Sequence, residues 1–193
     1  MTDHSWRTIG QLAELVGDYC WVERRLFALT GEWASAPEGD AEIRLFFAAA
    51  SRRHAELAER WCDRLPVRAG VERAALISPP SAPAAAALDR LQAEPGARGR
   101  LAGLVGVVLP RLVAAYGDHL SHASPVSDGP VLAVLGPARR TGSEEIESGL
   151  ALLERVPGPG GSTGIDAERA AITADLERYF GDNTGVFPCV RPS

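Results

Sequence analysis

Four polar side chains interrupt the apolar stripes of four predicted helices. Glu23 and His54 fall well inside the first two helices. His119 falls near the end of the third helix, and Glu145 falls near the start of a helical segment in the fourth. A carboxylate or an imidazole that faces a core is costly unless a partner satisfies it. Because carboxylate and imidazole together suit iron, manganese and zinc, the sequence predicts a metal site at these four residues.

Two tyrosines accompany the predicted ligands. Tyr19 lies one helical turn before Glu23, and Tyr116 lies one turn before His119. A phenol at this position can shape a pocket or relay a proton. We therefore assign Tyr19 and Tyr116 the catalytic roles in the metal interpretation.

A metal-free interpretation stays open at each of these positions. A histidine on an apolar stripe, such as His54, is usually a hydrogen-bonded core residue. Glu23 could instead pair with Arg52 or Arg53 of the next helix as a partly buried ion pair. The other two positions lie near helix ends, where a cation or a carboxylate can be favourable through the helix dipole alone.

Apolar spacing predicts the first two helices. The first runs from about residue 8 to residue 33, and the second follows Asp40, a suitable N-cap, and runs to about residue 64. The loop between them is short, so we expect antiparallel neighbours. The first stripe comprises Leu12, Leu15, Val16, Tyr19, Leu26, Phe27 and Thr30.

The third and fourth helices contain prolines. The third covers about residues 98–121, and Pro110 is expected to kink it or to split it. The fourth is predicted to begin at Pro130, to break at Gly136–Pro137 and to resume at Ser143, which could cap the resumed helix.

The remaining segments connect and extend these helices. Residues 66–96 are rich in proline and are predicted to form a long crossover between two helical hairpins. We predict one bundle domain over residues 1–156. Residues 157–193 are predicted to comprise a Gly/Pro linker, a further C-terminal helix over residues 166–180 and a tail, packed on the bundle or on a partner.

Three stretches carry a resemblance to a known superfamily. They are YCWVERRLFALTGEW at 19–33, SRRHAELAERWCDRLP at 51–66 and YGDHLSHASPVSDGP at 116–130, followed by a Glu-rich segment. Over about residues 8–156 the chain resembles the ferritin-like superfamily. The resemblance implies an all-α four-helix bundle with one long crossover and two metal ions. It also implies ligands from a Glu on helices one and three and a Glu-x-x-His on helices two and four.

The chain departs from that ligand pattern. Ser51 stands where the Glu three residues before His54 is expected. On helix three the carboxylate would be Asp118, or His119 would replace it, and helix four has no histidine. The resemblance therefore implies the fold together with an altered, mononuclear or lost metal site. It implies one or two ions of iron or manganese, or none if the site is lost.

Two functions follow from these patterns. The first is a metal-dependent oxidase or oxygenase that acts on a small-molecule substrate. The second is a bundle without metal that serves as a binding, scaffold or silent partner subunit, as a homodimer or in a heteromeric pair. The chain contains no GxGxxG, GxxxxGK[ST] or HExxH motif that would favour another enzyme class.

Net charge, apolar runs and cysteine spacing indicate which partners and which compartment to expect. The net charge of -5 and the pI near 5.4 argue against a general nucleic-acid binder. The sequence has no run of about 18 apolar residues and no signal-peptide pattern, so we expect no membrane contact and a cytoplasmic location. Cys20, Cys62 and Cys189 are too scattered for a disulfide framework, and the first two are expected to be small buried residues.

Overall fold

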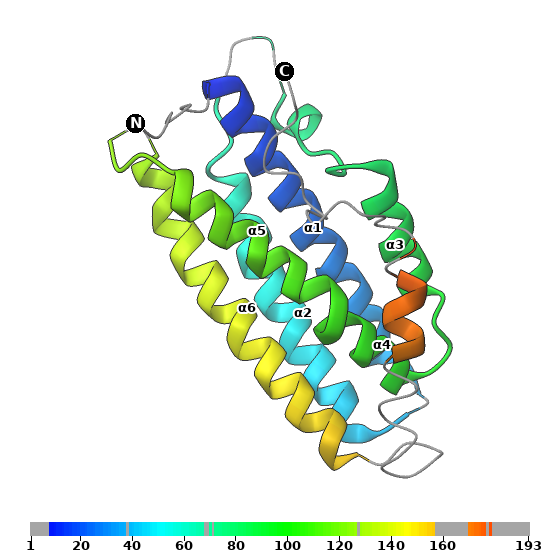
Figure 1. Cartoon of the computed structure of the whole chain (residues 1–193). Helices are drawn as coiled ribbons and strands as arrows, with labels where there is room; N and C mark the ends of the chain where they lie inside the picture. The colour runs from blue at the N-terminus through cyan, green and yellow to red at the C-terminus, as the bar shows by residue number, and fades with distance from the viewer. Residues whose placement is uncertain are drawn as a thin grey trace.

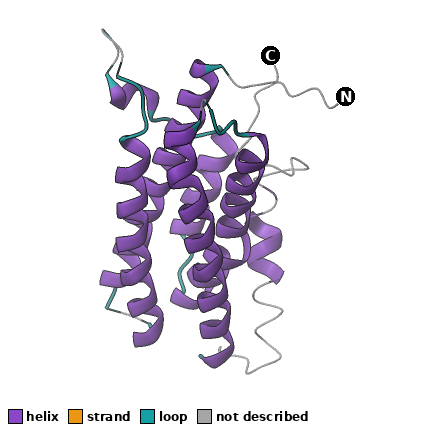
Figure 2. Ribbon diagram, turned by 90° about the vertical axis from the view of Figure 1, so that its left-hand side faces the viewer, coloured by secondary structure: helices purple, strands orange, loops and turns teal. Residues whose placement is uncertain are grey.

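A computed structural model describes residues 8–37, 39–67, 70, 72–126, 128–156, 170–176 and 178, and these residues form helices and loops without a strand. The long helices form four rods. These rods lie side by side (Figure 1), and their axes are roughly parallel when seen from the side (Figure 2). The predicted all-α class is confirmed for the described part of the chain. The elements are α1 (Ile9–Ser35), α2 (Ala41–Cys62), η1 (Arg73–Leu76), α3 (Ala82–Gln92), α4 (Ala97–Gly103), η2 (Leu104–Val108), α5 (Leu109–His122) and α6 (Gly129–Arg155).

Helices α1 and α2 begin and end close to the predicted residues. A capping box starts α1, because Thr8 accepts from the backbone of Gln11 and the Gln11 side chain accepts in return. Asp40 caps α2 through the backbone amides of its first turn, as predicted. The prediction that Phe27 belongs to the buried stripe is wrong: its side chain is 46% exposed, because it lies beside Leu26 and on the outer side of the helix.

The third rod continues through its proline. Helix α4, the π-helical turn η2 and α5 follow one another without a loop, and η2 ends directly before Leu109 and Pro110. Proline has no amide hydrogen and crowds the carbonyl four residues before it, and a π turn is one way a helix accommodates such a site. The predicted disturbance at Pro110 therefore takes the form of a π turn within one rod.

The fourth rod is a single helix, which corrects the prediction of a break. Helix α6 runs unbroken with Pro137 inside it, and Ser143 does not cap a helix but donates to the carbonyl of Arg139. An interior proline costs roughly 3 kcal/mol. Buried Leu135 and Ala138 continue the apolar stripe on both sides of it, so packing outweighs the local preference.

Side-chain contacts define the directions of the four rods. Glu23 meets His54 and Phe27 meets Ser51, so α1 and α2 are antiparallel. Tyr116 meets Glu23 while Arg100 lies over the ring of Trp33, so the third rod is antiparallel to α1. In the same way Arg53 meets Glu145 and Arg155 meets Glu42, so α6 is antiparallel to α2. The chain thus runs up, down, down and up, with one long crossover between α2 and α4.

The crossover lies against the first hairpin. A Cβ placed on Gly17 of α1 would be 1.9 Å from the carbonyl oxygen of Leu76, so the end of η1 passes directly over the backbone of α1. The described residues 170–176 are helical, and buried Leu176 packs near Leu91 and Gly103. The predicted linker lies outside the described residues.

The third rod is the most apolar one. The side chains at helical spacing along it are buried, namely Leu101, Leu104, Val105, Val108, Leu112, Ala115, Tyr116 and His119. By length and composition Ala97–His122 could cross a membrane, and 61% of its most apolar window is buried inside the bundle. The core helix of a soluble protein has the same properties. The absence of membrane contact and the cytoplasmic location therefore stay predictions.

Candidate functional site

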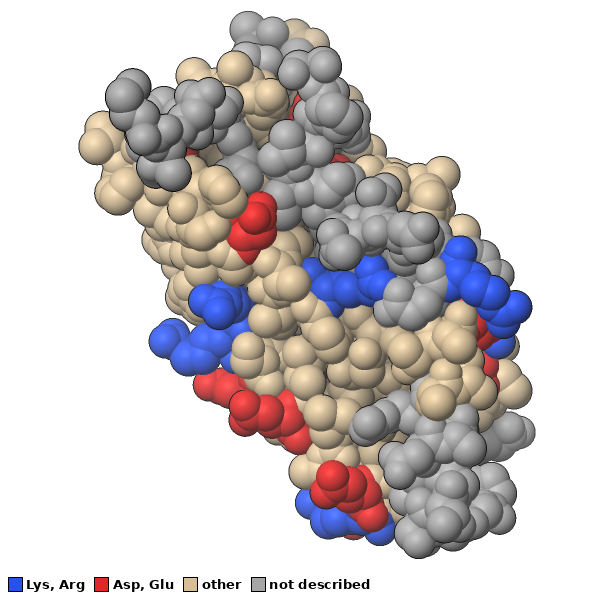
Figure 3. Space-filling model, in the orientation of Figure 1, with Lys and Arg blue, Asp and Glu red and all other residues tan. Residues whose placement is uncertain are grey.

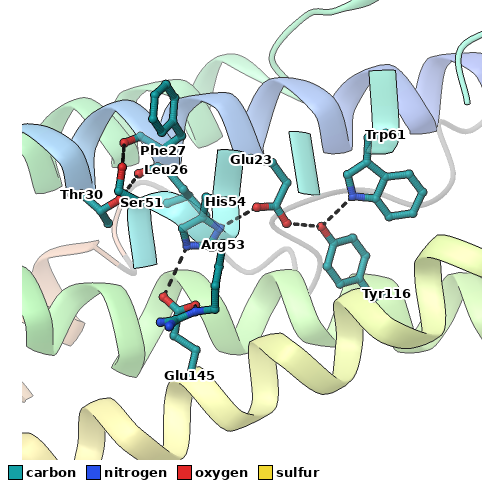
Figure 4. A network of polar contacts seen from close by, with 10 residues as sticks. All are labelled: Glu23, Leu26, Phe27, Thr30, Ser51, Arg53, His54, Trp61, Tyr116 and Glu145. Atoms are coloured by element: carbon teal, nitrogen blue, oxygen red, sulfur yellow. Dashed lines mark hydrogen bonds and ion pairs between the residues drawn. The ribbon is translucent and has the colours of Figure 1, made fainter. Parts of the chain in front are cut away.

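Four buried polar side chains from four different helices meet in the core (Figure 4). They are Glu23 of α1, His54 of α2, Tyr116 of α5 and Glu145 of α6, and each is at most 3% exposed. The structure thus brings together three of the four predicted metal ligands and one of the two predicted catalytic tyrosines.

His54 lies between the two carboxylates. Its Nδ1 is 2.6 Å from Oε2 of Glu23, and its Nε2 is 3.4 Å from Oε1 of Glu145. Both ring nitrogens donate only when the imidazole is protonated. The two neighbours therefore favour the imidazolium form, with a strong hydrogen bond to Glu23 and a longer ion pair with Glu145.

The pKa values of this group follow from its charges. Burial alone would lower the pKa of His54, but the charges of Glu23 and Glu145 outweigh it and raise the pKa from 6.5 to about 10. Burial would raise the pKa of Glu145, yet His54 and Arg53 lower it below 4.5. His54 is thus charged at neutral pH.

Arg53 completes the balance of charge. Its Nε donates to Oε2 of Glu145 at 2.9 Å, and its side chain is about one-third exposed. The alternative that Glu23 pairs with Arg52 or Arg53 is therefore wrong: Arg53 reaches α6, and Arg52 pairs with exposed Glu56 of its own helix. Two carboxylates face one imidazolium and one guanidinium, so the group is neutral as a whole.

Tyr116 extends the group towards α2. Its hydroxyl donates to Oε1 of Glu23 at 2.6 Å and accepts from Nε1 of Trp61 at 3.3 Å. Burial and the charge of Glu23 raise the pKa of Tyr116 well above 10, so the phenol stays protonated. Glu23 accepts from both Tyr116 and His54, which is the role of an ionised carboxylate.

The two other predicted residues lie beside this group. The ring of His119 is fully buried and stacks on the ring of Tyr19, with 5.8 Å between the centroids. Tyr19 packs edge-on against Tyr116 at 4.8 Å, and its hydroxyl is 3.4 Å from the carbonyl oxygen of Ala115. In α1, Tyr19 precedes Glu23 by one turn, so His119 lies alongside Tyr19 rather than between Glu23 and Glu145.

Ser51 fills the position where the resemblance implies a ligand. Its hydroxyl donates to the carbonyl of Phe27 at 3.0 Å, and the hydroxyl oxygen would lie 3.1 Å from a Cβ on Gly31. Helices α1 and α2 therefore approach too closely at this level to leave space for a longer side chain between them. Close packing of α1 against α2 thus occupies the space where the resemblance implies a carboxylate.

Comparison of the chain with protein-family models, curated proteins and solved structures finds no match.

The arrangement of Glu23, His54 and Glu145 does not bring the ligands of one ion to a single point. The two nitrogens of His54 face different carboxylates, and an imidazole gives a given ion only one nitrogen. Among the described residues, no group of three or more His, Cys, Asp or Glu is arranged to hold a metal ion. The assignment of Glu23, His54, His119 and Glu145 to iron or manganese thus stays a prediction.

The partners of two members of the network could not be identified from sequence: Arg53 is considered there as a partner of Glu23 but pairs with Glu145, and the contact of Trp61 with Tyr116 is not predicted. Arg53 precedes His54 and lies at the edge of the apolar stripe, and Trp61 is a regular stripe residue whose indole nitrogen finds Tyr116. The residue types alone indicate that a partner is needed, since Arg and Trp carry donors that must be satisfied when buried. Their partners depend on the relative position of the helices.

The surface shows no single dominant charge on the face drawn in Figure 3. Acidic and basic side chains lie there in small separate groups on a largely uncharged surface. That the protein does not bind nucleic acid stays a prediction.

Proposed function

We propose that the protein is a ferritin-like helical bundle in which a buried imidazolium and an arginine take the place of metal. It acts as a binding or partner subunit rather than as an oxidase. The observation that carries this proposal is the charge balance around His54. Two carboxylates are already neutralised by His54 and Arg53, and each charged group has an oppositely charged neighbour.

A metal ion would disturb this balance. A divalent ion would have to displace the proton of His54, so the net charge of the buried group would rise from zero to plus one. Unpaired buried charge costs several kcal/mol. The neutral arrangement therefore favours a structural role, in which the network fixes how α1, α2, α5 and α6 pack.

The order of the helices supports the ferritin-like part of the proposal. Two antiparallel hairpins joined by one long crossover are the connectivity that distinguishes ferritin-like bundles from simple up-and-down bundles. The network also lies where such bundles place their ligands, on inward faces at mid-length of the helices.

Metal content tests the proposal. Protein expressed without a tag and with iron and manganese supplied is expected to contain far less than one ion per chain by elemental mass spectrometry. The Glu23→Gln variant is the matched control, because it keeps the shape of the side chain and removes its charge. The same trace content in both proteins supports the proposal. Stoichiometric metal in the parent that is lost in Glu23→Gln would overturn it.

The second candidate is the metal-dependent oxidase or oxygenase acting on a small molecule. One observation favours it: Oε1 of Glu145 and Nε2 of His54 are buried, 3.4 Å apart, and neither makes a hydrogen bond. An ion between them would satisfy both atoms. His54 and Glu145 would then hold iron or manganese, which would supply oxidation chemistry when bound. Glu23 would stay beside Nδ1 of His54 and accept the proton of Tyr116 at Oε1. Stoichiometric metal in the experiment above would select this candidate.

A further inference from the structure

Two cysteines that are far apart in the sequence meet across the first helical hairpin. The thiol of Cys20 in α1 donates to the carbonyl of Ala58 at 3.5 Å, and Ala58 lies one turn before Cys62 in α2. The residues that precede the two cysteines also touch, since the rings of Tyr19 and Trp61 have centroids 5.0 Å apart. Both cysteines are free thiols.

The two thiols differ in access to solvent. Cys20 is fully buried, whereas Cys62 is partly exposed. Burial raises the pKa of Cys20 to about 11, and the neighbouring thiol of Cys62 adds to this effect, although Arg24 opposes it. A thiol is a nucleophile only as the thiolate. An oxidant from solvent therefore reacts with Cys62 first. Buried Cys20 then reacts only with the oxidised sulfur of Cys62.

We propose that Cys20 and Cys62 form a reversible disulfide when the protein meets a hydroperoxide, and that this bond locks α1 to α2. The thiolate of Cys62 attacks the peroxide, the O–O bond breaks, and a sulfenic acid forms on Cys62 while water or an alcohol leaves. The sulfur of Cys20 then attacks that of Cys62. The S–S bond forms, the S–O bond breaks, and hydroxide takes the proton of Cys20 and leaves as water. Two thiols are oxidised and one peroxide is reduced.

The disulfide joins the two helices that carry Glu23 and His54. Cys20 lies three residues before Glu23, and Cys62 lies two turns after His54. A bond there constrains the pairing of α1 and α2 whether or not the network binds metal. Formation of this disulfide therefore does not depend on the proposed function.

Peptide mapping tests the cross-link directly. Folded protein is treated with hydrogen peroxide, the remaining thiols are blocked, and the chain is cut with trypsin. Cleavage after arginine releases Cys20 in the peptide Thr8–Arg24 and Cys62 in the peptide Trp61–Arg64. The expected product is these two peptides joined, with two thiols lost per chain and recovered by dithiothreitol.

Three variants separate this product from other oxidation. Cys189→Ser is expected to leave the linked peptide unchanged, while Cys20→Ser is expected to abolish it and to leave Cys62 as sulfenic or sulfinic acid. Cys62→Ser is expected to protect Cys20 from oxidation in the folded protein. Oxidation of Cys62 in the parent without a linked peptide, or a link that involves Cys189 instead, would overturn the proposal. The parent unfolded in urea shows how the three thiols pair without the fold.

Discussion

Replacing His54 with leucine is expected to lower the free energy of unfolding by about 3–5 kcal/mol. The variant leaves Glu23 and Glu145 buried, with Arg53 as the remaining positive charge in the network. Removing one partner of a buried charge network costs much more than the network contributes as a whole, because the other charges stay desolvated without compensation. Urea denaturation followed by far-UV circular dichroism measures the loss, with the m-value as a check on two-state behaviour.

Two comparisons separate this explanation from a general loss of packing. His122→Leu changes an exposed histidine at the end of α5 and is expected to stay within about 0.5 kcal/mol of the parent. The triple variant Glu23→Leu/His54→Leu/Glu145→Leu removes all three charges, while Arg53 is exposed enough to turn to solvent. It is expected to be more stable than His54→Leu alone. Losses that simply add across the three positions would contradict a coupled network.

Replacing Gly17 with alanine is expected to destabilise the protein by about 1–3 kcal/mol or more, although alanine is the better helix former. The added methyl carbon would lie 1.9 Å from the carbonyl oxygen of Leu76, and that neighbour is backbone rather than a flexible side chain. Either η1 moves away or α1 bends. In the first case Leu76 and Ile77 lose their packing on the core.

Gly136→Ala is the matched control for this prediction. Gly136 is also a helical glycine, but nothing lies within 4 Å of the position of an added Cβ. The change is expected to be neutral or to stabilise by about 0.5–1 kcal/mol. Hydrogen exchange at residues 72–77 locates the effect, with faster exchange expected in Gly17→Ala alone. Equal stability of the two variants would show that the crossover does not depend on this contact.

Much of the fold could be predicted because helical spacing is a local property. The apolar stripes place Glu23, His54 and Glu145 on inward faces, and the structure buries all three. Glu145 was predicted as inward even though the boundaries of its helix were wrong. Glu145 lies seven residues after buried Ala138 and seven residues before buried Leu152, so the helical period places it on the inward face wherever the helix begins.

Errors arose where distant packing opposes a local preference. The unbroken helix at Pro137 depends on burial of its neighbours, and a local preference contains no information on that burial. The partners of Arg53 and of Cys20 depend on which turn of one helix faces which turn of another. That register is set by close contacts such as Ser51 on Phe27, which become evident only after the helices are packed.

His54 is held as an imidazolium between two carboxylates. A pKa of about 10 in the folded state, against 6.5 in the unfolded chain, means that only the folded protein keeps this proton between these values. His54 therefore contributes its full stabilisation below pH 6.5, and this contribution falls by up to about 1.4 kcal/mol per pH unit as the pH rises towards 10. At the acid end, the lowered pKa of Glu145 makes its contribution disappear as the pH falls below 4.5.

The most direct measurement is the titration of the His54 ring by NMR of protein labelled in histidine, with His54→Gln to assign its signal. Both ring nitrogens are expected to carry protons from pH 7 to pH 9, and the ring is expected to titrate near pH 10. Added iron(II) or manganese(II) is expected to leave this titration unchanged. A neutral ring at pH 8, or a signal that shifts or broadens when one equivalent of metal is added, would contradict it.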